Sequence, residues 1–304
     1  MKKWTTKQPE EVRRMKSTKA MKTKEVIEMK KLVSVVVFAV AGIVLVALAC
    51  ATGKLPAGVH PVVDVEWECL FGGTINGKWV DADAMLPHMK GGEMYTLYTR
   101  EGRVGTARGT RATYEEPNPA MSSPVLHLRL PKGLNVERCV IGISGDWNAL
   151  PRAPKWQSTQ QKVYQDAVRA LLSQEGLTGA SVNVTAVVRV DLEGDGTEEV
   201  LVSATTPRKG YPDSRIAVND YSLVLLRKLV KGKVKTSLIV GEFYRKREKF
   251  AAPGAFTLDA MLDVNGDGVM EVILGWRYYE GIGRSIYEIR GTAARQVLGG
   301  GFGS

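Results

Sequence analysis

Two short acidic segments carry the chemistry that is most visible in the sequence. The first reads DLEGDGTEE over residues 191–199, and the second reads DVNGDGVME over residues 263–271. In both segments, side chains with oxygen atoms stand at positions 1, 3, 5 and 9, and a glycine stands at position 6, where the backbone must turn sharply. Hard cations such as Ca²⁺ select carboxylate, amide and carbonyl oxygens supplied by a tight loop. The spacing therefore predicts a cation site in each segment.

Similar strand-forming stretches surround the two segments, which start 72 residues apart. Each segment joins the first and second of four predicted strands, and a hairpin follows. The repetition of this order at a fixed spacing predicts two copies of one structural unit. The predicted strands cover residues 184–190, 199–203, 221–230 and 234–244 in the first unit, and 256–262, 271–276, 285–289 and 293–298 in the second.

This pattern resembles the FG-GAP and VCBS-type repeats, in which a strand, a D-x-[DN]-G-D-G loop, a carboxylate three residues beyond the last glycine and an apolar strand follow one another. In that family the loops are calcium sites on the blades of integrin-α-like β-propellers. The resemblance implies four side-chain ligands and one backbone carbonyl in each loop. These are Asp191, Glu193, Asp195, Glu199 and the carbonyl of Thr197 in the first loop, and Asp263, Asn265, Asp267, Glu271 and the carbonyl of Val269 in the second.

The sequence departs from the family pattern in three ways. Glu193 is longer than the Asp or Asn expected at position 3, the FG dipeptide is absent before both loops, and residues 204–207 only approximate the GAP ending. A propeller closes with about four to eight blades, whereas only two repeats are visible here. We therefore expect an incomplete propeller, a β-sandwich, or a subunit that completes a propeller by oligomerising. The alternative for the loops is that Asp and Gly form Asx-type turns without a metal.

The remainder of the body predicts a mainly β protein with one helix. Residues 62–150 contain short strands separated by turn sequences and predict a small β-domain, with the clearest hairpin turn at Asn76-Gly77. Residues 151–304 begin with a helix and continue with the two repeats. Ser158 and Gln161 have the spacing of a capping box at the start of that helix, and Gly176 marks its end.

The N-terminus predicts export from the cytoplasm. Residues 1–31 form a basic tail, residues 32–49 form an uncharged apolar run that suits a signal peptide h-region or a membrane anchor, and residues 50–61 form a Gly/Pro-containing linker. The small-x-small sequence just before Cys50 resembles a bacterial lipoprotein signal, which implies lipidation of Cys50. Translation from Met1 or from Met29 is compatible with the pattern. A lipoprotein, a secreted protein and an uncleaved anchor all place the body on the extracytoplasmic side.

Charge and cysteine usage narrow the choice of partners. Of the formal net charge of +10, residues 1–31 contribute +7, so the body carries +3 and no basic stripe. This distribution argues against nucleic acid as a partner. The predicted partner of the basic N-terminus is the membrane. Beyond Cys50, Cys69 and Cys139 could form a disulfide in an oxidising compartment or remain as two buried thiols.

No catalytic motif stands out, since G-x-S-x-G, HExxH and phosphate-loop patterns are all absent from the sequence. The prediction is a calcium-binding module for binding or scaffolding at the cell surface, with a surface protein or a glycan as partner. Trp276, Tyr278 and Tyr279 could supply an aromatic contact face, although aromatic residues at strand ends also serve as core. The alternative is an extracytoplasmic hydrolase that uses acidic residues in a cleft lined by Asp146 or Glu280.

Overall fold

A computed structural model describes residues 58–114, 123–136, 140–206, 216–247 and 253–303. The predicted basic tail, the apolar run, Cys50 and Cys139 lie outside these residues, so the predictions made for them are not tested by the structure. Within the described ranges, no helix combines the length and apolar character needed to cross a membrane.

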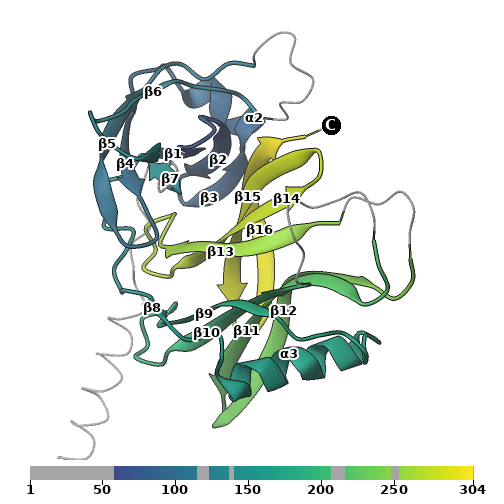
Figure 1. Ribbon diagram of the computed structural model, residues 1–304. Coiled ribbons are helices and arrows are strands. Elements are labelled where there is room, and N and C mark those ends of the chain that lie inside the picture. The colour runs from purple at the N-terminus through teal and green to yellow at the C-terminus, as the bar shows by residue number, and fades with distance from the viewer. Residues whose placement is uncertain (1–57, 115–122, 137–139, 207–215, 248–252, 304) are drawn as a thin grey trace, which may run out of the picture. The chain divides into compact units, whose positions relative to one another are not determined.

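An antiparallel sheet of seven strands forms the N-terminal part of the body (Figure 1). The predicted hairpin turn is confirmed, because Asn76 and Gly77 join the strand β2 (Leu70–Ile75) to the strand β3 (Lys78–Asp81) with φ of 50° and 74°. The predicted linker 50–61 is wrong at its end, since its last three residues pair with β2 as part of the first strand. The sheet has the order β3-β2-β1-β7-β4-β5-β6, with β1 (Val59–Asp64), β2 (Leu70–Ile75), β3 (Lys78–Asp81), β4 (Met94–Tyr98), β5 (Arg103–Gly109), β6 (Leu128–Arg129) and β7 (Ile141–Ile143). A short helix, α2 (Ala82–Met85), and a 3-10 turn, η1 (Leu86–His88), follow β3.

The two predicted repeats form two further antiparallel sheets, and the mainly β fold is confirmed. The first sheet has the order β12-β11-β10-β9-β8, with β8 (Lys155–Trp156), β9 (Val184–Val190), β10 (Glu199–Thr205), β11 (Asp220–Val230) and β12 (Lys233–Tyr244). The second has the order β13-β14-β15-β16, with β13 (Ala255–Leu262), β14 (Glu271–Tyr278), β15 (Gly281–Arg290) and β16 (Ala293–Phe302). The sequence did not predict β8, which adds a fifth strand to the first repeat. It also underestimated the lengths of β15 and β16, because glycines that the sequence analysis left outside the strands lie within them.

The predicted helix is present as α3 (Lys162–Gln174), but the predicted capping box is wrong. The Ser158 hydroxyl accepts a hydrogen bond from the amide of Gln160, and Gln161 is the N-cap residue, without a side-chain capping bond. The helix therefore begins three residues later than the capping box implied. Its buried side chains pack against the outer face of the first repeat sheet, with Val168 and Leu172 beside Val187 and Leu223 (Figure 1).

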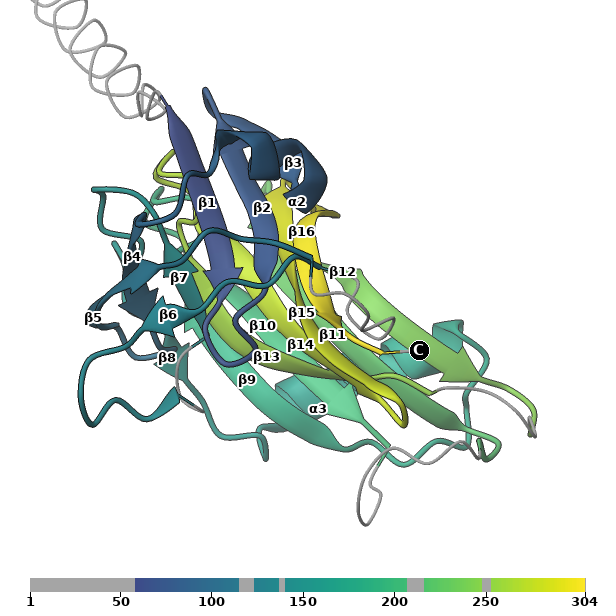
Figure 2. The same cartoon turned by 90° about the horizontal axis from the view of Figure 1, so that it is seen from above.

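The second repeat sheet is buried on both faces, which makes it the central layer of the described body. Along β14, Val272 and Leu274 join a core shared with the first repeat sheet, whereas Ile273 between them joins a core shared with the N-terminal sheet. Strand side chains alternate between faces, so a strand covered on both sides needs a continuous apolar run. Figure 2 shows the strands of the two repeat sheets laid over one another. The two repeats thus pack face to face through a shared core.

Substitution of Ile286 tests the shared core. This residue is fully buried between the central layer and the N-terminal sheet. We expect Ile286→Ala to lower the free energy of unfolding by about 2–5 kcal/mol, because the removed methyl groups leave a cavity. Urea denaturation measures the change. The matched substitution Val234→Ala on β12, where the side chain is 56% exposed, should change the stability by less than about 0.5 kcal/mol, and equal effects of the two substitutions would contradict the layered core.

Candidate metal centre

Both acidic loops occupy the same place in their sheets, between the first and second strands of the repeat. Asp191 follows β9 and Glu199 begins β10, while Asp263 follows β13 and Glu271 begins β14. The glycine at position 6 of each loop has a positive φ, 85° at Gly196 and 87° at Gly268, as have Gly194 and Gly266 at position 4. Residues with a Cβ rarely adopt this conformation. The glycine pattern is therefore explained by the turn, whether or not a metal binds.

The first aspartate of each loop gathers the amides of the turn. Asp191 accepts hydrogen bonds from the amide of Gly194 at 2.7 Å and from that of Gly196 at 2.9 Å. Asp263 accepts the equivalent bonds from Gly266 at 2.7 Å and from Gly268 at 3.0 Å. These are the Asx-type turns that the sequence offered as an alternative. Both loops thus have one backbone geometry, set by the carboxylate at position 1.

The last glutamate of each loop reaches back across the turn. Glu199 Oε2 accepts a hydrogen bond from the amide of Leu192 at 3.0 Å, and Glu271 Oε2 accepts one from the amide of Val264 at 2.8 Å. Each glutamate is only 1% exposed. In both repeats the glutamate at position 9 thus bonds to the amide of the residue that follows position 1, so the two ends of the loop lie at the same strand corner.

The side chains at positions 3 and 5 differ more between the loops. In the second loop, Asn265 is buried and donates a hydrogen bond from Nδ2 to Asp267 Oδ2 at 3.1 Å, while Asp267 Oδ1 accepts one from the amide of Val269 at 2.8 Å. In the first loop, Asp195 is exposed and accepts a bond from the amide of Thr197. The carbonyls of Thr197 and Val269 remain ligands implied by the resemblance alone.

A lysine lies at the first loop. Lys228 Nζ, on β11, is 2.5 Å from Glu193 Oε1 and 3.3 Å from Glu199 Oε1. Lys228 Nζ and Glu199 Oε1 are both buried, and neither makes a hydrogen bond of good geometry. The lysine therefore contacts the two glutamates as an ion pair. Although burial alone would lower the pKa of Lys228, the adjacent carboxylates of Glu193 and Glu199 raise that pKa above its ordinary value. The first loop is thus neutralised in part by the protein itself.

In the part of the chain that the structure describes, no lysine or arginine is held between carboxylates of the second loop as Lys228 is in the first, although the exposed Arg290 is near enough to Asp267 for the two charges to attract each other. Among the described residues, no ion pair joins a lysine or arginine to Asp263, Asp267 or Glu271. Burial raises the pKa of Asp263 to about 6, although amides of the turn partly offset the effect. Burial also raises the pKa of Glu271 well above its usual range. Burial of negative charge in the second loop therefore costs free energy, and a bound cation would offset this cost.

The fit of the two loops to Ca²⁺ therefore differs. The second loop offers three carboxylates and an amide oxygen, which is the donor set a hard dication takes, and no described lysine or arginine forms an ion pair with them. At the first loop, an ammonium group already contacts two of the implied ligands. Within the described ranges, no three His, Cys, Asp or Glu side chains are close enough to share an ion as they stand. A cation would thus have to draw together oxygens that now accept hydrogen bonds from the turn amides.

One arginine fixes the two loops to each other. Arg152 donates to the carbonyl of Asp191 at 2.5 Å, to that of Leu192 at 2.8 Å and, across to the second repeat, to that of Gly268 at 2.7 Å. The amide of Met270 also donates to the Leu192 carbonyl at 2.8 Å. Sequence reasoning missed Arg152 and Lys228, because both lie outside the repeating motif and meet the loops only through the tertiary fold.

A buried charge cluster and an aromatic face lie elsewhere on the second repeat. Arg284 forms ion pairs with Asp64 at 2.7 Å, Glu66 at 2.9 Å and Asp259 at 2.8 Å. Beside this cluster is a pocket of about 390 Å³ whose wall includes Trp276. The Trp276 ring is nearly parallel to that of Tyr278, with an interplanar angle of 15° and centroids 6.1 Å apart, and Tyr279 meets Tyr278 edge-on. The predicted aromatic residues thus do gather on one strand end.

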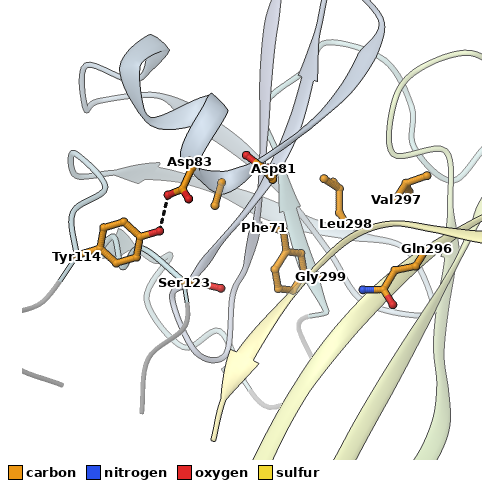
Figure 3. Close-up of a pocket in the computed structure, with 10 residues that line it drawn as sticks. Phe71, Asp81, Asp83, Tyr114, Ser123, Gln296, Val297, Leu298 and Gly299 are labelled. Carbon is orange, nitrogen blue, oxygen red and sulfur yellow. Dashed lines mark hydrogen bonds between the residues drawn. The ribbon is translucent and has the colours of Figure 1, made fainter. Parts of the chain in front are cut away.

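A second pocket, of about 360 Å³, lies between the N-terminal sheet and β16 (Figure 3). Its acidic side chains are already engaged, since Asp83 accepts a hydrogen bond from the Tyr114 hydroxyl at 2.5 Å and Asp81 caps α2. The bond to Asp83 raises the pKa of Tyr114 to about 12. Asp146 and Glu280, on which the hydrolase alternative depended, are exposed and line neither pocket.

The predicted disulfide remains a prediction. Cys69 is a buried free thiol in the structure, and Cys139 is not among the described residues. Burial raises the pKa of the Cys69 thiol far above its ordinary value, so this group stays protonated at neutral pH.

Comparison of the chain with known proteins gave no match to a family model, to a curated protein or to a solved structure. The assignment of the loops therefore depends on their own geometry and on the similarity between the two repeats.

Substitution of Arg152 tests whether one side chain holds the loops together. We expect Arg152→Ala to lower the free energy of unfolding by about 2–3 kcal/mol, because carbonyls of both loops lose a charged donor. Hydrogen exchange should also quicken at the amides of both loops. Arg169→Ala, which removes only an exposed ion pair on α3, should cost less than about 1 kcal/mol. If exchange quickens in one loop only, the arginine does not couple them.

Proposed function

We propose that this chain is an exported, membrane-tethered β protein that uses Ca²⁺ as a structural ion and acts as a binding or scaffolding module at the cell surface. The observation that carries the calcium proposal is the second loop, where Asp263 and Glu271 are buried without a lysine or arginine partner among the described residues. Uncompensated buried carboxylates destabilise a folded protein unless a cation or protons neutralise them.

A structural role for the ion follows from what surrounds the loop. Asp263 and Glu271 both accept bonds from backbone amides, and the loop is held to its neighbour through Arg152. Neither pocket includes a loop carboxylate in its lining. A bound Ca²⁺ would supply positive charge and order the strand corner, while the protein would supply the oxygens.

The proposal of a cell-surface location rests on the sequence of the first fifty residues. A basic tail followed by an uncharged apolar run and a cysteine supports export and anchoring on the extracytoplasmic side. Calcium is abundant outside cells, where modules that bind it with Kd values of about 10⁻⁴–10⁻³ M are loaded. Location and metal use are thus consistent with each other.

A contact face for the partner is proposed at the end of β14. The nearly parallel rings of Trp276 and Tyr278 lie above glycines of β15 and β16, because a Cβ at Gly283 would be 2.3 Å from the Trp276 ring and one at Gly281 would be 2.2 Å from that of Tyr278. The negative face of an aromatic ring attracts the partly positive C–H groups of a sugar ring. The flat pair beside the 390 Å³ pocket favours a glycan over a surface protein as the partner.

Thermal unfolding of the full chain tests calcium binding directly. We expect millimolar CaCl₂ to raise the melting temperature by several degrees relative to EDTA, because a ligand that binds only the folded state stabilises it by mass action. A variant that carries Asp191→Ala and Asp263→Ala should melt at the same temperature in both conditions. A wild-type chain that does not respond to calcium would contradict the proposal, and the loops would then be plain Asx turns.

Detergent-phase partitioning tests the tether. We expect the full chain, expressed in a bacterial host, to enter the detergent-rich phase because an acyl chain or an apolar helix binds to micelles. Cys50→Ser should move the protein to the aqueous phase if lipidation anchors it, and should have no effect if the apolar run itself is the anchor. Recovery of the wild-type protein in the aqueous phase of the cytoplasmic fraction would contradict both export and tethering.

A further inference from the structure

The two repeats differ in charge at one equivalent position beside their loops. In the first repeat Val200 pairs with Arg227, and in the second Val272 pairs with Tyr287. The residue that follows the paired one is Lys228 on β11 and Glu288 on β15. Each therefore lies across from the glutamate that ends the loop of its own repeat, Glu199 or Glu271.

Lys228 turns into its loop. Its side chain is about nine-tenths buried, and Nζ lies between the carboxylates of Glu193 and Glu199, which are positions 3 and 9 of the implied ligand set. Glu199 Oε1 is buried and has no hydrogen bond, so the ammonium group is the positive charge that balances it. An ammonium group held between two ligand carboxylates has the place and the sign of charge of a bound cation.

Glu288 instead brings a negative charge to the second repeat. It forms ion pairs with two exposed arginines, Arg290 at 2.8 Å and Arg295 at 2.9 Å. Glu288 therefore faces Glu271 with a second negative charge, and the arginines that pair with it are exposed rather than held between two carboxylates of the second loop. The two equivalent positions thus have opposite effects on their loops.

The unusual residue at position 3 of the first loop is explained by the same contact. Glu193 departs from the Asp or Asn of the family pattern, and its longer side chain is the one that meets Lys228 Nζ at 2.5 Å. The second loop has Asn265 at this position, with a shorter side chain that bonds within the loop. A long acid with a lysine in one repeat, and a short amide with a glutamate in the other, form two matched pairs.

We propose that Lys228 acts as the permanent internal cation of the first loop, so that this loop takes no metal and Ca²⁺ binds in the second loop alone. The inference rests on the proposed function for its second half, since the second loop must bind the ion. Its first half, the replacement of a metal by a lysine, stands on the contacts of Lys228.

Isothermal titration of the full chain in detergent with CaCl₂ tests the proposal, with Tb³⁺ luminescence as a second probe of the same sites. We expect one ion per chain in the wild type. The matched pair Asp191→Asn and Asp263→Asn should separate the loops, because the first should leave binding unchanged and the second should abolish it. Two ions in the wild type, or loss of an ion in Asp191→Asn, would overturn the proposal while the calcium function survives.

Removal of the ammonium group should open the first loop to a metal. We expect Lys228→Met to bind two ions and to melt on the order of 10 °C below the wild type in EDTA, because its carboxylates lose their buried partner. Calcium should restore much of this loss. Lys235→Met, on an exposed part of β12, should match the wild type in both measurements. A folded Lys228→Met that binds no additional ion would overturn the proposal.

The same titrations separate a failure of calcium binding by the second loop from a failure of Lys228 to replace a metal in the first. A wild type that binds no ion, together with a Lys228→Met variant that binds one, would contradict calcium binding by the second loop and support the lysine as a metal substitute. If Lys228→Met does not fold, the comparison of Asp191→Asn with Asp263→Asn decides the question, since that pair leaves the lysine in place.

Discussion

The balance of buried charge at the strand corners is the constraint on which the two repeats depend. Each corner encloses a glutamate with 1% exposure and an aspartate that orders the turn. Carboxylates in such positions must meet a cation or take up protons, because an unpaired buried charge costs several kcal/mol. The first repeat meets this requirement with Lys228. The second has no such side chain within the described ranges, and this difference gives the loops different chemistry despite a common backbone.

Arginines extend the same principle across the layers of the body. Arg152 joins the two loops through their carbonyls, and Arg284 joins the central sheet to Asp64 and Glu66 at the end of β1. Trp67 lies against the Arg284 guanidinium at 4.6 Å, which combines a cation–π contact with the ion pairs. Apolar cores hold the faces of the sheets together, while these arginines set how the loops and edges meet. Arg152 thus positions the loops of the candidate site, and Arg284 positions the sheet that carries the second loop.

Much of the C-terminal fold could be predicted from the sequence, and the reasons are local. The run Val272-Ile273-Leu274 and the glycine pattern of the loops specify strands and turns by themselves, so the strand order within each repeat followed. The partners of the loops could not be predicted, since Arg152 and Lys228 reach them only through tertiary packing. The helix start was wrong because Gln161, rather than Ser158, is the N-cap residue, and its backbone is extended. The assignment of β15 was too short because its glycines resemble a loop, although they lie beneath aromatic rings.

Anomalous diffraction from crystals of the chain grown with CaCl₂ would show which of the two loops holds the ion. Ca²⁺ binds oxygen ligands at about 2.3–2.6 Å, so we expect a single strong peak at that distance from Asp263, Asp267 and Glu271, with Lys228 Nζ still beside Glu193 in the first loop. A peak in the first loop would contradict the role of Lys228 as its internal cation. No peak in the second loop, with its carboxylates bonded only to the turn amides, would contradict calcium binding there.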